Sequence, residues 1–117
     1  MEIKKIHFDN RGEIYQFDIG DEQHILVTYK PGIARGGHYH KTNQMHICLA
    51  GNLKFTLRNM GTGVETIRFL KEGDSLLIPK FTAHLIESDV EAVMSESRIG
   101  DYEAIDFPPY REKAKPR

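Results

Sequence analysis

The chain has few cysteines, no long apolar run and almost no net charge, and each of these absences excludes a class of protein. It has a single cysteine, Cys48, so no internal disulfide can form. No stretch approaches the ~20 consecutive apolar residues of a transmembrane helix, and residues 1–7 contain no apolar run typical of a signal peptide. A net charge of −1 gives no electrostatic reason to bind nucleic acid or an anionic membrane. We therefore expect a cytoplasmic protein with neither of those partners.

Length and composition predict one domain. A chain of 117 residues has the usual size of a single domain, and its 39% hydrophobic and 28% charged residues are typical of soluble proteins. Residues 101–117 are locally basic and contain Pro108-Pro109, which cannot extend a central strand. We expect one domain over residues 1–117, with this tail packed on its outside or on a partner subunit.

The β-prone runs are short and separated by turn signals at intervals of about ten residues, a pattern typical of a sandwich or barrel. No long apolar periodicity of 3.6 residues is present, so a helical core is not expected. The prediction is an all-β fold. Its expected strands are Glu2–Phe8, Glu13–Ile19, Gln23–Lys30, Met45–Leu49, Leu53–Arg58, Glu65–Leu70, Ser75–Ile78, His84–Glu87 and Glu91–Ser97.

Two histidines, His38 and His40, lie one residue apart behind a glycine-rich turn. On an extended chain, second neighbours point to the same side. Two neutral imidazoles aimed at one point can hold a divalent cation or act together on a substrate proton. A third histidine far along the chain, His84, is the candidate that would complete such a site.

The spacing around these histidines resembles the two sequence motifs of the cupin superfamily, over roughly residues 23–97. The first block runs from Gly32 through the two histidines and Gln44 to Gly51, and the second runs from Gly73 through Pro79 to His84. The resemblance implies a jelly-roll (cupin) double-stranded β-barrel. It also implies metal ligands at His38, His40 and His84.

This sequence departs from the cupin pattern at two positions. Gln44 stands where the family normally has a glutamate ligand, and Phe81 stands where the second motif usually has glycine. Without the carboxylate, a bound divalent ion is held less strongly but is a better Lewis acid. Gln44 could ligate through its amide oxygen or orient another ligand. The expected cofactor is a divalent metal (zinc, iron, manganese or nickel) or none, with metal affinity falling below about pH 6.

The loop Arg35-Gly36-Gly37-His38-Tyr39-His40-Lys41 is similar to that of cupins that act on nucleotide sugars in polysaccharide biosynthesis. These include deoxysugar ketoisomerases and epimerase-type domains. The resemblance implies acid and base roles for the two histidines without a metal, and a substrate-holding role for Arg35. Lys41 would add a point charge, and Tyr102 could close over the pocket as an acid or stacking group. Alternatively, Arg35 and Lys41 are charged loop residues exposed to solvent, and Tyr102 is an aromatic residue that packs within the tail.

Strand alternation predicts that His46 and Cys48 face inward together with Gln44, which makes His46 a candidate general base. Met45, Ile47 and Leu49 would then form an exposed apolar stripe, which a homodimer would cover. Alternatively, a β-bulge after the turn reverses the alternation, so that Met45, Ile47 and Leu49 face the core.

The expected function is that of an isomerase or epimerase of a small polar, sugar-like or nucleotide-sugar substrate. Catalysis would rest on His38 and His40, with or without a metal, and on His46. One alternative is a dioxygenase of the three-histidine type. Another is a non-catalytic small-ligand-binding or sensor protein.

Overall fold

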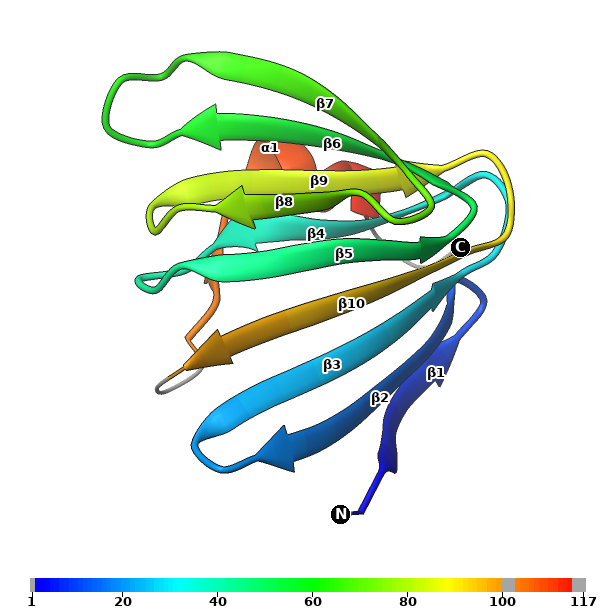
Figure 1. Ribbon diagram of the computed structural model, residues 1–117. Coiled ribbons are helices and arrows are strands. Elements are labelled where there is room, and N and C mark those ends of the chain that lie inside the picture. Colours follow the sequence, from blue (N-terminus) through cyan, green and yellow to red (C-terminus); the bar gives the residue numbers. More distant parts are fainter. Residues whose placement is uncertain (1, 100–102, 115–117) are drawn as a thin grey trace.

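Two antiparallel β-sheets face each other in the computed structural model of the chain, which describes residues 2–99 and 103–114 (Figure 1). One sheet has six strands in the order β1-β2-β3-β10-β5-β8, and the other has five in the order β11-β4-β9-β6-β7. The strands are β1 (Lys4–Asp9), β2 (Gly12–Ile19), β3 (Glu22–Tyr29), β4 (Ile33–Tyr39), β5 (Gln44–Ala50), β6 (Asn52–Asn59), β7 (Glu65–Lys71), β8 (Ser75–Ile78), β9 (Thr82–Ser88), β10 (Ala92–Ile99) and β11 (Ile105–Asp106).

This arrangement confirms the all-β jelly-roll fold, although the two sheets do not close into a complete barrel. Beyond the strands, the described chain contains the short helix α1 (Pro108–Arg111) and the 3₁₀ turn η1 (Glu112–Ala114). No helix in the described residues is long and apolar enough to cross a membrane.

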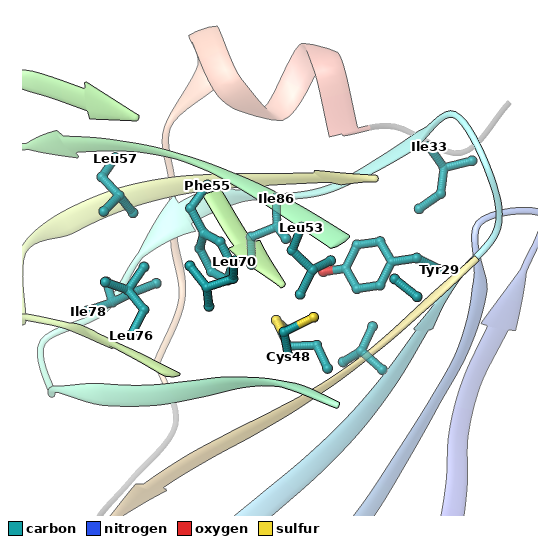
Figure 2. Packing of buried hydrophobic residues seen from close by; sticks show 13 residues of the cluster. Tyr29, Ile33, Cys48, Leu53, Phe55, Leu57, Leu70, Leu76, Ile78 and Ile86 are labelled. Carbon is teal, nitrogen blue, oxygen red and sulfur yellow. The ribbon is translucent and has the colours of Figure 1, made fainter. Parts of the chain in front are cut away.

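Apolar side chains from alternate strand positions fill the space between the sheets (Figure 2). The cluster consists of Val27, Tyr29, Ile33, Cys48, Leu53, Phe55, Leu57, Leu70, Leu76, Ile78, Ile86, Ala92 and Met94. In β5, Gln44, His46 and Cys48 are buried, whereas Met45 and Leu49 are exposed. The alternation predicted for this strand is therefore confirmed.

Strand β4 was not expected from the sequence, because its segment is rich in glycine and follows a Pro-Gly turn. In the structure it pairs with both β9 and β11. Gly36 adopts a φ of +99°, and a Cβ there would lie 2.7 Å from the carbonyl oxygen of His84. A register irregularity between Gly36 and His38 places His38 directly opposite His84. The glycine thus lets the two strands approach at the level of the histidines.

Phe81, in the turn before β9, is a non-glycine residue with positive φ, +60°. Its backbone N–H donates to the carbonyl oxygen of His40 at 2.8 Å, and its carbonyl accepts from the N–H of Met60 at 3.0 Å. The turn thus keeps the left-handed conformation that glycine normally supplies. These two hydrogen bonds offset the strain, which is roughly 1–2 kcal/mol for an L-residue.

The C-terminal segment covers part of the outer face of the five-stranded sheet (Figure 1). Tyr110 and Ala114 are buried there against Ala83 and Leu85 of β9. The Arg11 side chain donates to the carbonyl oxygen of Ala114 at 2.7 Å and so links this segment to the other sheet.

Candidate metal centre

Three histidines from two adjacent strands converge inside the sandwich. His38 is the penultimate residue of β4, His40 directly follows the strand, and His84 lies opposite His38 in β9. One imidazole nitrogen from each lies within 4.8 Å of those of the other two. Their ring centroids are 4.8–5.4 Å apart. The convergence predicted from the spacing is therefore confirmed.

Backbone carbonyls select which ring nitrogen of two histidines carries the proton. His40 Nδ1 lies 2.8 Å from the carbonyl oxygen of Glu103, and His84 Nδ1 lies 3.4 Å from that of Thr82. A carbonyl accepts only, so each Nδ1 is the N–H donor and the lone pair remains on Nε2. Such outer hydrogen bonds orient histidine ligands in metal sites.

Burial keeps the three imidazoles neutral, the form that binds metals. It lowers the pKa of His38 to about 4, with nearby His40 as a further cause. Burial also lowers the pKa of His40, and it lowers that of His84 well below the ordinary value of 6.5. The three groups therefore offer lone pairs at neutral pH.

The geometry suits one shared ion. Around an ion with metal–nitrogen bonds of about 2.1 Å and tetrahedral geometry, two donors lie roughly 3.4 Å apart. The observed limit of 4.8 Å therefore requires the most distant pair to approach by up to about 1.4 Å when an ion binds. Three uncharged nitrogen donors suit a divalent transition metal better than calcium or magnesium.

Next to the three histidines lies a buried polar chain that starts at Gln44. The Gln44 amide oxygen is 3.2 Å from His46 Nε2, and that nitrogen is 3.3 Å from a carboxylate oxygen of Glu96. The other Glu96 oxygen accepts from Arg98 at 2.9 Å. The His46 ring is fully buried, with its centroid 5.9 Å from that of His84. His46 thus lies beside the histidine cluster, and Gln44 contacts His46.

A cavity of about 310 Å³ opens beside the cluster. His38 and His84 form part of its wall, and apolar side chains that include Ile86 and Met94 form another part. Its polar wall residues include Arg11, Arg35, Arg98, Arg111, Gln16, Gln23, Tyr29 and Glu96. A pocket of this size, with both apolar walls and polar groups, is typical of a small-molecule site, and its many polar residues favour a polar ligand.

The arginines of this wall differ in how their charge is balanced. Arg11 forms an ion pair with Asp9 at 2.6 Å, and Arg98 forms one with Glu96. Arg35 is 6% exposed, and no carboxylate within the described residues pairs with it. Its polar contacts include a 3.3 Å hydrogen bond to the carbonyl oxygen of Thr28. The wall therefore carries an unbalanced buried positive charge.

Hydrogen-bond donors without partners face this region. Among the described residues, the Tyr29 hydroxyl and Arg35 Nε of this wall, and Gln44 Nε2 outside it, are buried and have no hydrogen-bond partner. All of these atoms can donate, and buried donors are normally satisfied. An acceptor supplied by a ligand fits such a wall.

The remaining predicted site residues are placed differently. The Lys41 side chain is exposed, and its ammonium group lies 3.5 Å from the carboxylate of Glu103. It is absent from the described cavity wall, so its substrate role stays a prediction. Tyr102 lies outside the described residues, and its role also stays a prediction.

Sequence reasoning missed Tyr29, Glu96 and Arg98 as cavity residues. The signal was strand alternation, because Tyr29 shares a face with buried Val27, and Glu96 and Arg98 share a face with buried Met94. A single aromatic or charged residue in a short strand was too weak a signal to identify them.

Comparisons with solved structures support the fold. The capsular polysaccharide assembling protein CapF from Staphylococcus aureus superposes with a TM-score of 0.76 at 21% identity, over 88% of this chain and 30% of that one. Oxalate decarboxylase from Bacillus subtilis superposes with a TM-score of 0.78 at 23% identity, over 88% and 29% respectively. Another structure of that decarboxylase, whose description names Mn(II) centres, gives 0.77 at 22% identity, over the same shares.

The chain spans under a third of the length of these solved chains. No curated protein sequence matches it. The family profile described as "Cupin domain" matches residues 25–95, which contain all three histidines and most of both sheets. With the jelly-roll fold and the histidine cluster in place, this match shows that the chain belongs to the cupin domain family.

Proposed function

We propose that this chain is a metal-dependent enzyme that isomerises or epimerises a small anionic, sugar-like substrate. The observation that carries the proposal is the position of the histidine cluster: His38 and His84 lie in the wall of a cavity that also contains an unbalanced buried arginine. A cluster built only for stability would not need to border an open cavity.

In this proposal His38, His40 and His84 hold the ion, and Gln44 supplies a further oxygen donor or orients the group beside it. A divalent ion with uncharged ligands acts as a Lewis acid that polarises a carbonyl or hydroxyl oxygen. Arg35 orients the substrate through its negative charge. His46, a fully buried imidazole whose ring centroid lies 5.9 Å from that of His84, would move a proton to or from the substrate.

The cavity volume limits the substrate. A volume of about 310 Å³ equals roughly ten water molecules at ~30 Å³ each. A single sugar ring fits within it, and the nucleotide part of a nucleotide sugar would extend outside. The name of CapF links that protein to capsular polysaccharide. At 21% identity this likeness concerns the fold alone. The choice of a sugar-like substrate therefore rests on the cavity, which is small, polar and positively charged.

Metal content is the first test. Protein purified without added metal should contain close to one divalent ion per chain by elemental analysis. His40→Ala should lose it, whereas His24→Ala should keep it, because His24 lies apart from the cluster and stacks on Phe17. Sugars, sugar acids and nucleotide sugars are then screened by thermal shift. Substoichiometric metal, together with turnover that survives chelation, would contradict the metal-dependent mechanism.

A dioxygenase is the second candidate, and the observation that favours it is the all-histidine donor set. Three neutral ligands leave coordination positions open for a substrate and oxygen on iron. Iron in the purified protein and substrate-dependent oxygen uptake would favour this function. A cavity ligand that binds without turnover would instead favour a sensor.

We also propose that the chain forms a homodimer through the outer face of the six-stranded sheet. Met45, Leu49 and Leu77 are 37%, 43% and 50% exposed on this face. Leu26 of β3 and Ile47 of β5 belong to the same face, because both pair directly with Ser95 of β10 from either side. The equivalent face of the other sheet is partly covered by the chain's own C-terminal segment. An apolar face depleted of charge is typical of a subunit interface.

A further inference from the structure

Arg35 and Tyr29 form a pair of buried donors in the cavity wall. The guanidinium carbon of Arg35 lies 5.6 Å from the centroid of the Tyr29 ring. Tyr29 is 2% exposed and Arg35 is 6% exposed. Within the described residues, the Tyr29 hydroxyl and Arg35 Nε have no hydrogen-bond partner. Two adjacent donors are thus withdrawn from water without an acceptor, an arrangement that folding alone does not favour.

The Tyr29 hydroxyl is directed into the protein interior. Figure 2 shows the ring extending from β3 into the space between the sheets, with its oxygen innermost. Burial raises the pKa of Tyr29, with the nearby Glu96 carboxylate as a lesser cause, so the hydroxyl keeps its proton. It is therefore a donor, and an acceptor atom is needed opposite it.

Of the three buried arginines in the wall, Arg35 is the one without a carboxylate partner among the described residues. Asp9 neutralises Arg11, and Glu96 neutralises Arg98. Arg111 is half-buried, and its guanidinium donates to the carbonyl oxygen of Gly36 at 3.2 Å. Arg111 also has no carboxylate partner among the described residues, but its charge is partly solvated. The buried arginines alone therefore leave one excess positive charge, that of Arg35.

We propose that Tyr29 and Arg35 form an anion subsite for a small organic carboxylate. Two donors match the two oxygens of one carboxylate, and a single negative charge balances the single excess positive charge. In the metal-free protein, a phosphate dianion would bring one negative charge more than Arg35 balances, beside the Glu96 carboxylate in the same cavity wall. The inference rests on the proposed function and deepens it, because the ligand's other end would then lie at the histidine cluster.

Glycolate, a small hydroxy acid, is the probe. Thermal shifts are measured on chelator-treated protein, at matched ionic strength with chloride as the reference anion. Glycolate should raise the unfolding temperature of the wild-type protein above the chloride value. Tyr29→Phe should require about tenfold or more glycolate for the same shift, because a hydrogen bond to a charged group is lost. Arg35→Gln should abolish the response.

Stability without ligand separates a binding role from a structural one. Tyr29→Phe removes a buried hydroxyl that has no partner, so the unliganded variant should unfold at the same temperature as wild type or a few degrees higher. Tyr15→Phe is the matched control. The Tyr15 hydroxyl bonds Glu13, outside the cavity, so this variant should respond to glycolate as wild type does.

Three results would overturn the proposal: an equal glycolate response in Tyr29→Phe and wild type, a large loss of unliganded stability in Tyr29→Phe, or inorganic phosphate binding more tightly than glycolate. Measuring metal content separately keeps two failures distinct. A glycolate response in a protein that binds no metal would leave the subsite standing and refute the metal-dependent function. Metal binding with no glycolate response would refute the subsite and leave the metal-dependent function standing.

Discussion

Replacing Gly36 with alanine should damage both the fold and the site, because this glycine sets the distance between β4 and β9. Its φ is +99°, and an added Cβ would lie 2.7 Å from the His84 carbonyl oxygen. The unfavourable backbone conformation costs about 1–3 kcal/mol, and forcing the strands apart costs a further 1–3 kcal/mol. We expect a loss of roughly 2–6 kcal/mol, which lowers the unfolding temperature by about 8–25 °C.

Gly32→Ala is the matched control. Gly32 also has positive φ, +76°, but nothing in the described structure lies within 4 Å of a Cβ at that position. It should lose only about 1–2 kcal/mol, the conformational part. Calorimetry on both variants isolates the contact with β9, and titration with Zn²⁺ should show weaker binding in Gly36→Ala alone, because His38 moves away from His84. Equal losses of stability in the two variants would refute this reasoning.

Two further outcomes test the site and the surface. The metal-free protein should lose stability as the pH falls from about 6.5 toward 4, because the unfolded chain binds a proton at His38 that the folded chain, with a pKa of about 4 at this residue, does not. This residue alone accounts for roughly 1–2 kcal/mol at pH 5.5, and a urea midpoint unchanged between pH 7.5 and 5.5 would contradict it. Leu49→Asp should convert the proposed dimer into a monomer in size-exclusion chromatography with light scattering. Ile67→Asp, on the other sheet, should leave the dimer intact, and a monomeric wild type would contradict the interface.

Most strands could be predicted because their apolar residues alternate and their turns are marked by glycine, asparagine and aspartate. Strand β4 could not. Ile33–Tyr39 contains two glycines and follows Pro31, so its local preference is for a turn. It becomes a strand because β9 and β11 supply hydrogen-bond partners on both sides, and such partners are invisible in a local window. The strand that the sequence did not predict is therefore the one that carries His38.

The histidine cluster could be predicted because it depends on spacing, whereas the rest of the cavity depends on which faces of two distant strands meet. Tyr29 and Glu96 come from β3 and β10, which pair with each other but are far apart in sequence. From the sequence, each reads equally well as a solvated strand residue. Their importance emerges only when burial and missing partners are known, as with the unpaired donors of Tyr29 and Arg35.

Phe81 illustrates a departure from the family pattern that the fold tolerates. The sequence alone left open whether a residue other than glycine would change the turn before β9. The backbone keeps a φ of +60°, because hydrogen bonds to His40 and Met60 fix it on both sides. The turn therefore still delivers His84 to the cluster.

The neutral Gln44 and the unbalanced Arg35 make sense together. In the proposed site, an ion held by uncharged ligands keeps its full +2 charge, and Arg35 adds another positive charge in the same cavity wall. A protein carboxylate at position 44 would offset part of this charge and compete with an anionic ligand for it. With an amide there, the neutralising charge has to come from the ligand. The departure at position 44 and the lack of a carboxylate partner for Arg35 among the described residues therefore favour the same kind of substrate, one that brings its own negative charge into the cavity.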